Sequence, residues 1–206
     1  YSKAKTGKSK SKGVIQFESN LDNNILRIQK ELIEQTYITS EYNVFTIRDP
    51  KERTIYSLPF RDRVVQHAIM NIIERLWTSV FICHSYSSIK GKGIHGAWKH
   101  IRRDMKNRKQ TQYCLKMDIT KFYPSIDHHI MKQIIRKKIK DIKLLALLDG
   151  IIDSAPGMPI GNYLSQFLAN LYLSYFDHWL KEVKRVKYYY RYADDLIILG
   201  DSKQDL

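Results

Sequence analysis

Apolar residues recur at helical spacing along the first half of the chain, interrupted by one stretch with a different pattern. The predicted helices span residues 22–33, 61–81 and 94–105. Between the first two, the runs 42–47 and 54–58 are rich in β-branched and aromatic residues, and they flank the turn-forming residues 48–52. The pattern therefore predicts a β-hairpin between helices.

The second half of the chain mixes strands and helices. Residues 113–120 alternate as in a strand, which puts Leu115 and Met117 on one face and Asp118 on the other. Two apolar runs over 188–199 surround an acidic pair and predict a second hairpin. Further helices are predicted over 127–140, 143–152 and 163–183, with a loop rich in Pro and Gly over 155–161. This order predicts an α+β fold in which helices back one face of a small antiparallel sheet.

Composition narrows the classes of partner. The chain has 206 residues, of which 43% are hydrophobic, and a net charge of +14. This apolar content suffices for the core of one domain or of two small lobes, and the charge favours a polyanionic partner. Nucleic acid and an acidic membrane surface both fit, as does a basic protein without such a partner. The best candidate for a membrane span, 144–152, is too short and contains Asp149.

The beginning of the chain is strongly basic. Five lysines, with serine and glycine and no acidic residue, occupy the first thirteen positions. This composition predicts a flexible basic arm over residues 1–20, either a solvated tail or an RNA contact. The chain begins with Tyr1 rather than Met, so we expect it to be part of a longer polypeptide. Cys83 and Cys114 do not form a CxxC pair, which argues against a disulfide framework or a structural zinc site.

An acidic pair lies inside the predicted C-terminal hairpin. Asp194 and Asp195 stand between the aromatic run 188–190 and the aliphatic run 196–199. Two adjacent carboxylates in an apolar hairpin are costly to desolvate and repel each other, so a divalent cation is the natural compensation. An exposed turn would also explain them.

Asp118 completes the acidic set. It lies on the polar face of the predicted strand, although it would also serve to cap the turn that follows. A lone carboxylate at the end of one strand, together with an acidic pair in a tight hairpin, is the arrangement that two metal ions about 4 Å apart require. The sequence therefore predicts a two-metal site formed by Asp118, Asp194 and Asp195.

The residues around these carboxylates resemble those of reverse transcriptases from bacteria and retroelements. Residues 192–195 (YADD) are similar to the Y-x-D-D motif of that family, and the segment 115–123 is similar to its first catalytic motif. The resemblance implies an RNA-directed DNA polymerase with a right-hand fold of fingers and palm. It also implies two Mg²⁺ ions, with Mn²⁺ able to substitute. Their expected ligands are Asp118, Asp194, Asp195 and the carbonyl of Ile119.

The same resemblance implies further site residues. The residues expected to bind the incoming dNTP are Lys51, Arg53, Tyr123, Ile160 and Gly161. Those expected to contact template or primer are Lys90, Lys92, Gln166 and Tyr192. Tyr123 would act as the steric gate that excludes a ribose 2′-OH, although a core aromatic beside a strand has the same sequence pattern. Solvated hairpin charges would likewise explain Lys51 and Arg53.

One loop departs from the common form of the family. Residues 160–166 follow the form I-G-x-x-x-S-Q, which resembles the enzymes of diversity-generating retroelements that miscopy template adenines. Ile160 gives no side-chain hydrogen bond to the new base pair, so low fidelity is expected. Group II intron, retron and phage-defence reverse transcriptases remain alternatives. From another class, a non-catalytic RNA-binding scaffold also remains.

The resemblance also predicts partners and domain layout. The implied partners are an RNA template, a DNA primer and dNTPs, with an accessory protein as a further candidate and no membrane. After the arm over 1–20, residues 21–112 would form the fingers with the first palm elements, and 113–206 would form the palm. In that family the thumb follows the Y-x-D-D hairpin, so we expect the thumb to be missing from this chain. The expected localisation is cytoplasmic, for a bacterial or phage-encoded protein.

Overall fold

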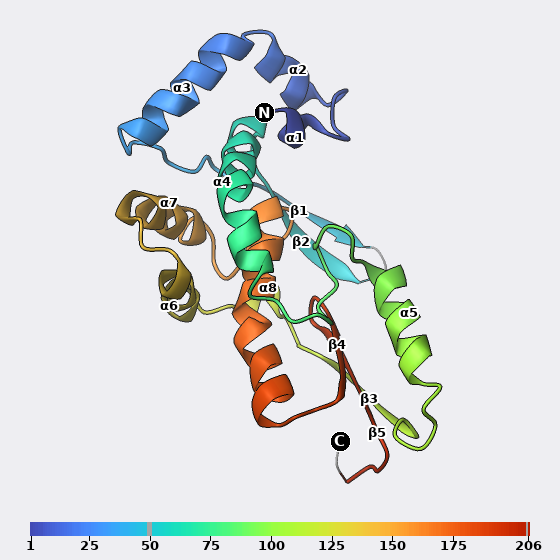
Figure 1. Cartoon of the computed structure of the whole chain (residues 1–206). Coiled ribbons are helices and arrows are strands. Elements are labelled where there is room, and N and C mark those ends of the chain that lie inside the picture. The colour runs from blue at the N-terminus through green and yellow to red at the C-terminus, as the bar shows by residue number, and fades with distance from the viewer. Residues whose placement is uncertain (49–50, 205) are drawn as a thin grey trace. The chain divides into compact units, whose positions relative to one another are not determined.

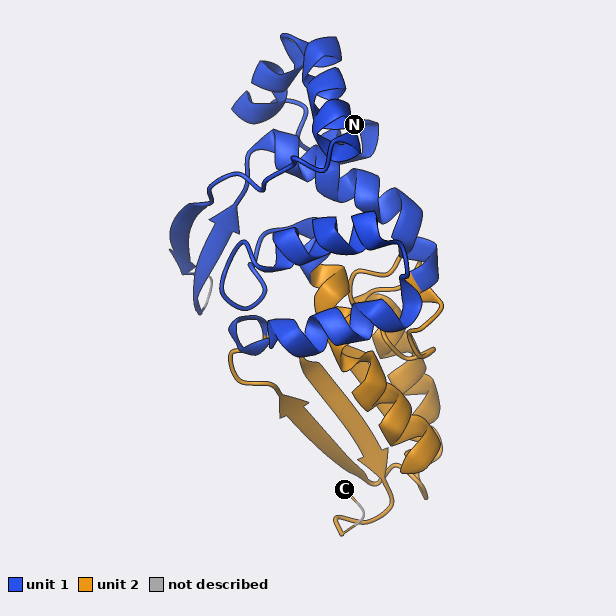
Figure 2. Ribbon diagram, turned by 90° about the vertical axis from the view of Figure 1, so that its left-hand side faces the viewer, with its two compact units in different colours: residues 1–76, 123–165 blue, residues 77–122, 166–206 orange. Residues whose placement is uncertain are grey.

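The computed structural model describes residues 1–48, 51–204 and 206. The turn predicted over 48–52 includes Asp49 and Pro50, which lie outside the described residues. The chain divides into two compact units, coloured separately in Figure 2: unit 1 holds residues 1–76 and 123–165, and unit 2 holds residues 77–122 and 166–206. The units do not follow the predicted boundary at residue 113. Compact units follow packing rather than chain order, and this chain leaves each unit and returns to it.

The N-terminal segment of unit 1 is helical. Its helices are α1 (Ser2–Lys5), α2 (Lys12–Glu18) and α3 (Leu21–Ile33). Ala4 and Val14 are fully buried, and Phe17 packs edge-on against Phe60 with 5.3 Å between ring centroids. The structure thus has helices with buried side chains where the composition predicts a flexible arm over 1–20. Burial of a few apolar side chains offsets the entropic cost of ordering the backbone. Because lysines dominate the composition of this segment, composition alone did not indicate these buried residues.

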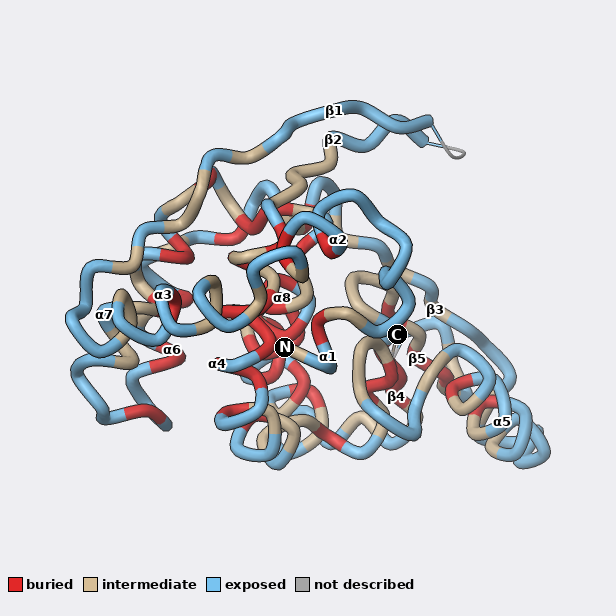
Figure 3. The backbone as a smooth tube through the Cα atoms, turned by 90° about the horizontal axis from the view of Figure 1, so that it is seen from above, coloured by how far each residue is buried: buried red, intermediate tan, exposed pale blue. Residues whose placement is uncertain are grey.

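The hairpin predicted for unit 1 is confirmed. Strands β1 (Asn43–Arg48) and β2 (Glu52–Ser57) pair antiparallel along their whole length. Every residue of β1 is exposed, as the pale blue tube in Figure 3 shows. Because an isolated two-stranded hairpin is marginally stable, its base needs support. Tyr42 and Tyr56 provide part of it through an edge-on contact with 5.7 Å between ring centroids.

Three longer helices belong mainly to unit 1. They are α4 (Phe60–Thr78), α6 (His128–Lys138) and α7 (Ile142–Ile152). Helices α6 and α7 begin where Asp127 and Asp141 accept hydrogen bonds from first-turn backbone N–H groups, at 2.9 and 2.8 Å. Buried positions on α4 recur at helical spacing and include Val65, Ile69 and Ile73. Among the described residues, no helix combines the length and the hydropathy needed to cross a membrane.

Unit 2 contains a three-stranded antiparallel sheet. Its strands are β3 (Tyr113–Asp118), β5 (Asp195–Gly200) and β4 (Tyr188–Tyr192), in the spatial order β3-β5-β4. Its helices are α5 (Ile94–Asp104) and most of α8 (Tyr163–His178), which continues as the π-helical turn η2 (Trp179–Val183). These elements lie where the periodicity of the sequence predicts them.

The two faces of this sheet are covered differently. On one face, Leu115 and Ile198 pack in a cluster with Leu180 of η2. On the other face, Tyr190 packs in a cluster with Ala97 of α5. Accordingly, α5 and α8 flank the sheet on opposite sides in Figure 1. The prediction of helices on one face was therefore incomplete, because α5 covers the β4 side of the second face, whereas the β3 residues of that face are exposed.

Candidate active site

Two of the predicted catalytic carboxylates lie side by side on the exposed part of the sheet of unit 2. Asp118 is the last residue of β3, Asp195 is the first residue of β5, and the two are register partners. On the other side of Asp195, its register partner is Tyr192 of β4. The three residues therefore form a row across one end of the sheet. Directly opposed strand residues have Cβ atoms about 4.5–5.5 Å apart, which lets two carboxylates reach one ion.

The third carboxylate lies in the turn that joins β4 to β5. Ala193 has a φ of +53°, a left-handed conformation that costs roughly 1–2 kcal/mol for a residue with a Cβ. Asp194 follows it and is half-buried. Because Tyr192 pairs with Asp195, the turn holds two residues, and Asp194 is adjacent to the row of register partners.

These carboxylates fit a hard divalent cation. Asp118 and Asp195 are like charges opposed across two strands, an arrangement that destabilises a sheet. Lys116 Nζ lies 3.5 Å from Asp195 Oδ1, with 68% and 49% of the two side chains exposed. Within the described residues, no three His, Cys, Asp or Glu side chains form a ready-made metal cage. Mg²⁺ needs no such cage, because one or two carboxylates commonly bind it together with substrate phosphates and water.

A buried ion pair lies on the opposite face of the sheet, next to the turn. The side chains of Arg191 on β4 and Asp177 on α8 are both 0% exposed, and Nε–Oδ1 and Nη2–Oδ2 distances of 2.8 and 2.6 Å join them. The hydroxyl of Tyr189 donates to Asp177 at 2.6 Å. Burial, assisted by the charge of Asp177, raises the pKa of Tyr189 and keeps this donor protonated. The network was not predicted, although an arginine at a core-facing strand position signals a buried partner.

Two of the four residues predicted to contact template or primer, Lys92 and Gln166, have side-chain hydrogen bonds within unit 2. Lys92 Nζ donates to the carbonyl of Cys83 at 2.6 Å. Gln166 accepts a hydrogen bond from the hydroxyl of Ser88 at 2.9 Å. Lys90 is exposed. Lys92 and Gln166 thus help to fix the loop that carries Lys90, and a direct template contact stays a prediction for all three.

In unit 1, the predicted dNTP-binding residues Ile160 and Gly161 lie against β2, the strand that carries Arg53. The backbone N–H of Tyr56 donates to the carbonyl of Ile160 at 2.9 Å. Gly161 has a φ of +119°, and a Cβ there would lie 3.0 Å from the carbonyl oxygen of Tyr56 and 3.3 Å from Ile55 Cγ2, so glycine permits this close approach. Arg53 lies on the same strand face as Ile55, two residues earlier. Arg53 is exposed and, within the described residues, has no carboxylate partner.

The backbone of Tyr123 is fixed to the same loop. Tyr123 opens the 3₁₀ turn η1 (Tyr123–Ser125) and is half-buried. Its carbonyl accepts a hydrogen bond from the backbone N–H of Met158 at 2.8 Å. Gly157 has a φ of +61°, and a Cβ there would lie 2.6 Å from the carbonyl oxygen of Pro124. The steric-gate role of Tyr123 stays a prediction, as does triphosphate binding by Lys51, which is exposed next to β2.

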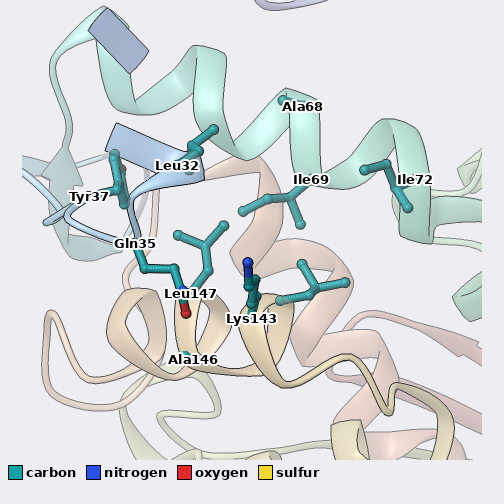
Figure 4. Close-up of a pocket in the computed structure, with 10 residues that line it drawn as sticks. Leu32, Gln35, Tyr37, Ala68, Ile69, Ile72, Lys143, Ala146 and Leu147 are labelled. Carbon is teal, nitrogen blue, oxygen red and sulfur yellow. The ribbon is translucent and has the colours of Figure 1, made fainter. Parts of the chain in front are cut away.

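An apolar pocket in unit 1 is a separate feature. It lies among residues of α3, α4 and α7 and the segment after α3, and it has a volume of about 280 Å³. Leu32, Ile69 and Leu147 surround it in Figure 4, and its lining residues with polar groups are Gln35, Tyr37 and Lys143. None of the described residues that line it is an acid. Chemistry with two bound metal ions requires carboxylates, so this pocket is not the candidate active site.

Comparison with known proteins identifies the family. A family model described as reverse transcriptase (RNA-dependent DNA polymerase) matches residues 47–206, which include all of the predicted site residues. This chain belongs to the reverse transcriptase family. The fold of this reverse transcriptase chain agrees, since small antiparallel sheets combine with helices as in an α+β fingers-and-palm arrangement.

Relatives of this reverse transcriptase chain include a group II intron-encoded protein. Protein YkfC of Escherichia coli (strain K12) is 23% identical over 177 residues, covering 76% of this chain and 46% of the relative. LtrA, the group II intron-encoded protein of Lactococcus lactis subsp. cremoris, is 28% identical over 136 residues, covering 61% of this chain and 22% of the relative. A chain of the solved partial Cas6-RT-Cas1–Cas2 complex is 18% identical with a TM-score of 0.43, covering 94% of this chain and 36% of that chain. This chain thus spans less than half the length of each of these proteins.

Proposed function

We propose that this chain carries the active site of an RNA-directed DNA polymerase that extends a primer with dNTPs on an RNA template. The observation that carries the proposal is the register pairing of Asp118 with Asp195, next to Asp194 in the turn. Carboxylates opposed across two strands repel each other, and a cation bound between them relieves that repulsion. We assign the sheet of unit 2 to the palm and the hairpin of unit 1 to the fingers.

The proposed reaction is an in-line transfer, in which the primer 3′-oxygen attacks the α-phosphate of the dNTP and pyrophosphate leaves. Asp118 and Asp194 would hold two Mg²⁺ ions, with Asp195 assisting. When bound, the ions lower the pKa of the primer hydroxyl and offset charge on the leaving group. Arg53 grips the triphosphate, because its planar guanidinium matches phosphate oxygens, and the ring of Tyr123 excludes a ribose 2′-OH.

Primer extension tests the proposal. With poly(rA)/oligo(dT), Mg²⁺ and dTTP, the full-length protein is expected to extend the primer, and Asp194→Ala is expected to abolish extension. A wild-type protein that binds RNA but never extends a primer would support the alternative of an RNA-binding scaffold. Extension with rNTPs in place of dNTPs would instead indicate an RNA-directed RNA polymerase.

We further propose that the enzyme is of the low-fidelity, diversity-generating type. Ile160 supports this assignment: its carbonyl is bonded to the backbone of Tyr56, and its side chain has no group that hydrogen-bonds a base pair. Contacts that penalise a misaligned pair are then weaker. The similarity to LtrA supports a group II intron enzyme as the alternative.

Sequencing of the cDNA made by the full-length protein distinguishes these types. Substitutions concentrated at template adenines are expected, and Ile160→Gln is expected to reduce them. An even, low error spectrum would remove the diversity-generating assignment and favour the intron, retron or phage-defence types.

A further inference from the structure

The guanidinium of Arg191 is fully occupied within unit 2. A guanidinium has five N–H donors. Nε and Nη2 bind Asp177, Nη2 also donates to the carbonyl of Asn170 at 3.2 Å, and Nη1 donates to Asn170 Oδ1 at 2.9 Å. The remaining Nη1 donor binds the carbonyl of Ala193 at 3.0 Å. Since every donor has an acceptor in the chain, Arg191 acts through the chain and not on a substrate.

The contact with Ala193 is where this network reaches the catalytic turn. Its carbonyl belongs to the peptide unit that leads into Asp194. Because a peptide unit is planar and rigid, a hydrogen bond to its oxygen constrains the orientation of the next residue. Ala193 also holds a φ of +53°, a conformation that persists where surrounding contacts over-determine it. Arg191 supplies such a contact from within the same hairpin.

Arg191 is itself held at both its side chain and its backbone. Its partners Asp177 and Asn170 lie on α8 and are 0% and 3% exposed. The backbone N–H of Arg191 donates to the carbonyl of His84, and the carbonyl of Arg191 accepts from the N–H of Tyr86, each at 3.0 Å. The group that fixes the turn is therefore anchored to a helix and to a neighbouring segment.

Asp177 neutralises the charge of Arg191 on the side of the sheet opposite the carboxylates proposed to bind metal. Its side chain lies on the core-facing side of the sheet with Asp177, whereas Asp118 and Asp195 lie on the opposite face. A bidentate pair of this kind consumes the positive charge of the arginine. The network therefore shapes the turn without neutralising the acids that would bind cations.

We propose that Arg191 is a positioning residue for metal binding: it holds the peptide between Ala193 and Asp194, and through it the Asp194 carboxylate, in the orientation that a shared cation requires. The inference rests on the proposed function. Groups that orient metal ligands typically contribute about 10–100-fold to metal affinity or activity. Lysine does not replace arginine here, because three donors on one nitrogen cannot reach Asp177 and the turn at once.

Binding of Mn²⁺ to the chain, followed by electron paramagnetic resonance, tests this proposal. Arg191→Lys keeps the buried positive charge but loses the fork, and we expect its Mn²⁺ affinity to fall about 10–100-fold. Tyr189→Phe is the matched control, because it removes a hydrogen bond to Asp177 in the same network and leaves the turn contact in place. Its unfolding midpoint is expected to fall while its Mn²⁺ affinity stays at the wild-type level.

If Arg191→Lys does not fold, the double variant Arg191→Met/Asp177→Leu provides a second test. It removes both charges together, a change that is often neutral for stability, and it too is expected to bind Mn²⁺ more weakly. Equal Mn²⁺ affinity in a folded arginine variant and in Tyr189→Phe would overturn the proposal and leave Arg191 a structural residue. A wild-type chain that binds no Mn²⁺ would overturn the metal chemistry of the proposed function as well, whereas losses confined to the variants bear on Arg191 alone.

Discussion

The two units hold their predicted functional residues in opposite ways. In unit 2, Asp118 and Asp195 lie on a sheet whose other face contains the fully buried pair of Arg191 and Asp177. In unit 1, Arg53 lies on a hairpin whose first strand is exposed throughout. Ions that share ligands require carboxylates held in one geometry, whereas a triphosphate offers many oxygens to a guanidinium. Rigid support is therefore concentrated in the unit where the proposed reaction would develop charge.

The largest expected effect comes from a carboxylate of unit 2. Asp118→Asn is expected to reduce primer extension by the full-length protein by about 10³-fold or more, because metal ions stabilise the transition state by several kcal/mol. The same change relieves a like-charge contact with Asp195, so the unfolding midpoint is expected to stay or rise. Asp201→Asn, at an exposed position just after β5, is the control and should leave both quantities unchanged. If Asp118→Asn lowered the unfolding midpoint as well as the activity, Asp118 would contribute to stability, contrary to this prediction.

On the exposed hairpin of unit 1, the expected effect is on substrate binding. Arg53→Ala is expected to raise the KM for dNTP about 10–100-fold, because hydrogen bonds between charged groups contribute about 1.5–3 kcal/mol, while kcat changes less. Arg48→Ala is the matched control on the same hairpin, since Arg48 is already paired with Glu52 at 3.0 Å. Steady-state kinetics at saturating primer–template measures both. Equal increases in KM for the two variants would indicate a general attraction between positive charge and the dNTP, and not a specific contact with Arg53.

The loop that lies against β2 in unit 1 is expected to contribute to stability. Gly161→Ala is expected to lower the free energy of unfolding by about 1–3 kcal/mol, because the added Cβ meets the Tyr56 carbonyl in a backbone conformation with φ of +119°. Gly150→Ala, in α7, meets open space and is expected to raise that free energy by about 0.5–1 kcal/mol. Chemical denaturation followed by circular dichroism measures both changes. A neutral Gly161→Ala would mean that the loop is not held against the strand.

The smallest expected effect is a pH dependence in unit 1. His67 stacks on Tyr163 with 4.6 Å between ring centroids. Burial, assisted by the charge of Arg63, lowers the pKa of His67 from 6.5 to about 4. Since the folded pKa lies below the unfolded one, this contribution to stability is complete above pH 6.5 and is lost as the pH falls toward 4.

His67→Phe checks this pH dependence, because it keeps a stacked ring and removes the titrating group. Between pH 6.5 and 4, the variant is expected to lose less unfolding free energy than the wild type, by on the order of 1 kcal/mol. Thermal unfolding measured in steps across the window tests it. If the unfolding free energy of the variant depends on pH in the same way as that of the wild type, His67 does not titrate as described.

The elements of the fold were predictable where the signal is local. The helix predicted over 61–81 is observed as α4 (Phe60–Thr78), and the predicted strand faces are those of β3. The N-terminal segment was not predictable from composition, because the order of Phe17 depends on packing against Phe60, far along the chain. The position of α5 on the second face of the sheet was missed for the same reason. The apolar positions Ala97 and Ile101 predict a buried helix face but not the surface that this face packs against.

Local sequence was enough to predict the candidate catalytic side chains: the motif around Asp118, the acidic pair at 194 and 195, and the alternation that puts Asp118 on a polar strand face. These features are local, since the spacing of side chains along a strand is a property of the backbone. Two features appear only in the folded protein: Asp118 pairs with Asp195 in register, and Arg191 binds the turn while it is paired with Asp177. Strand register and buried pairing depend on contacts between residues distant in the chain, which side-chain periodicity does not encode.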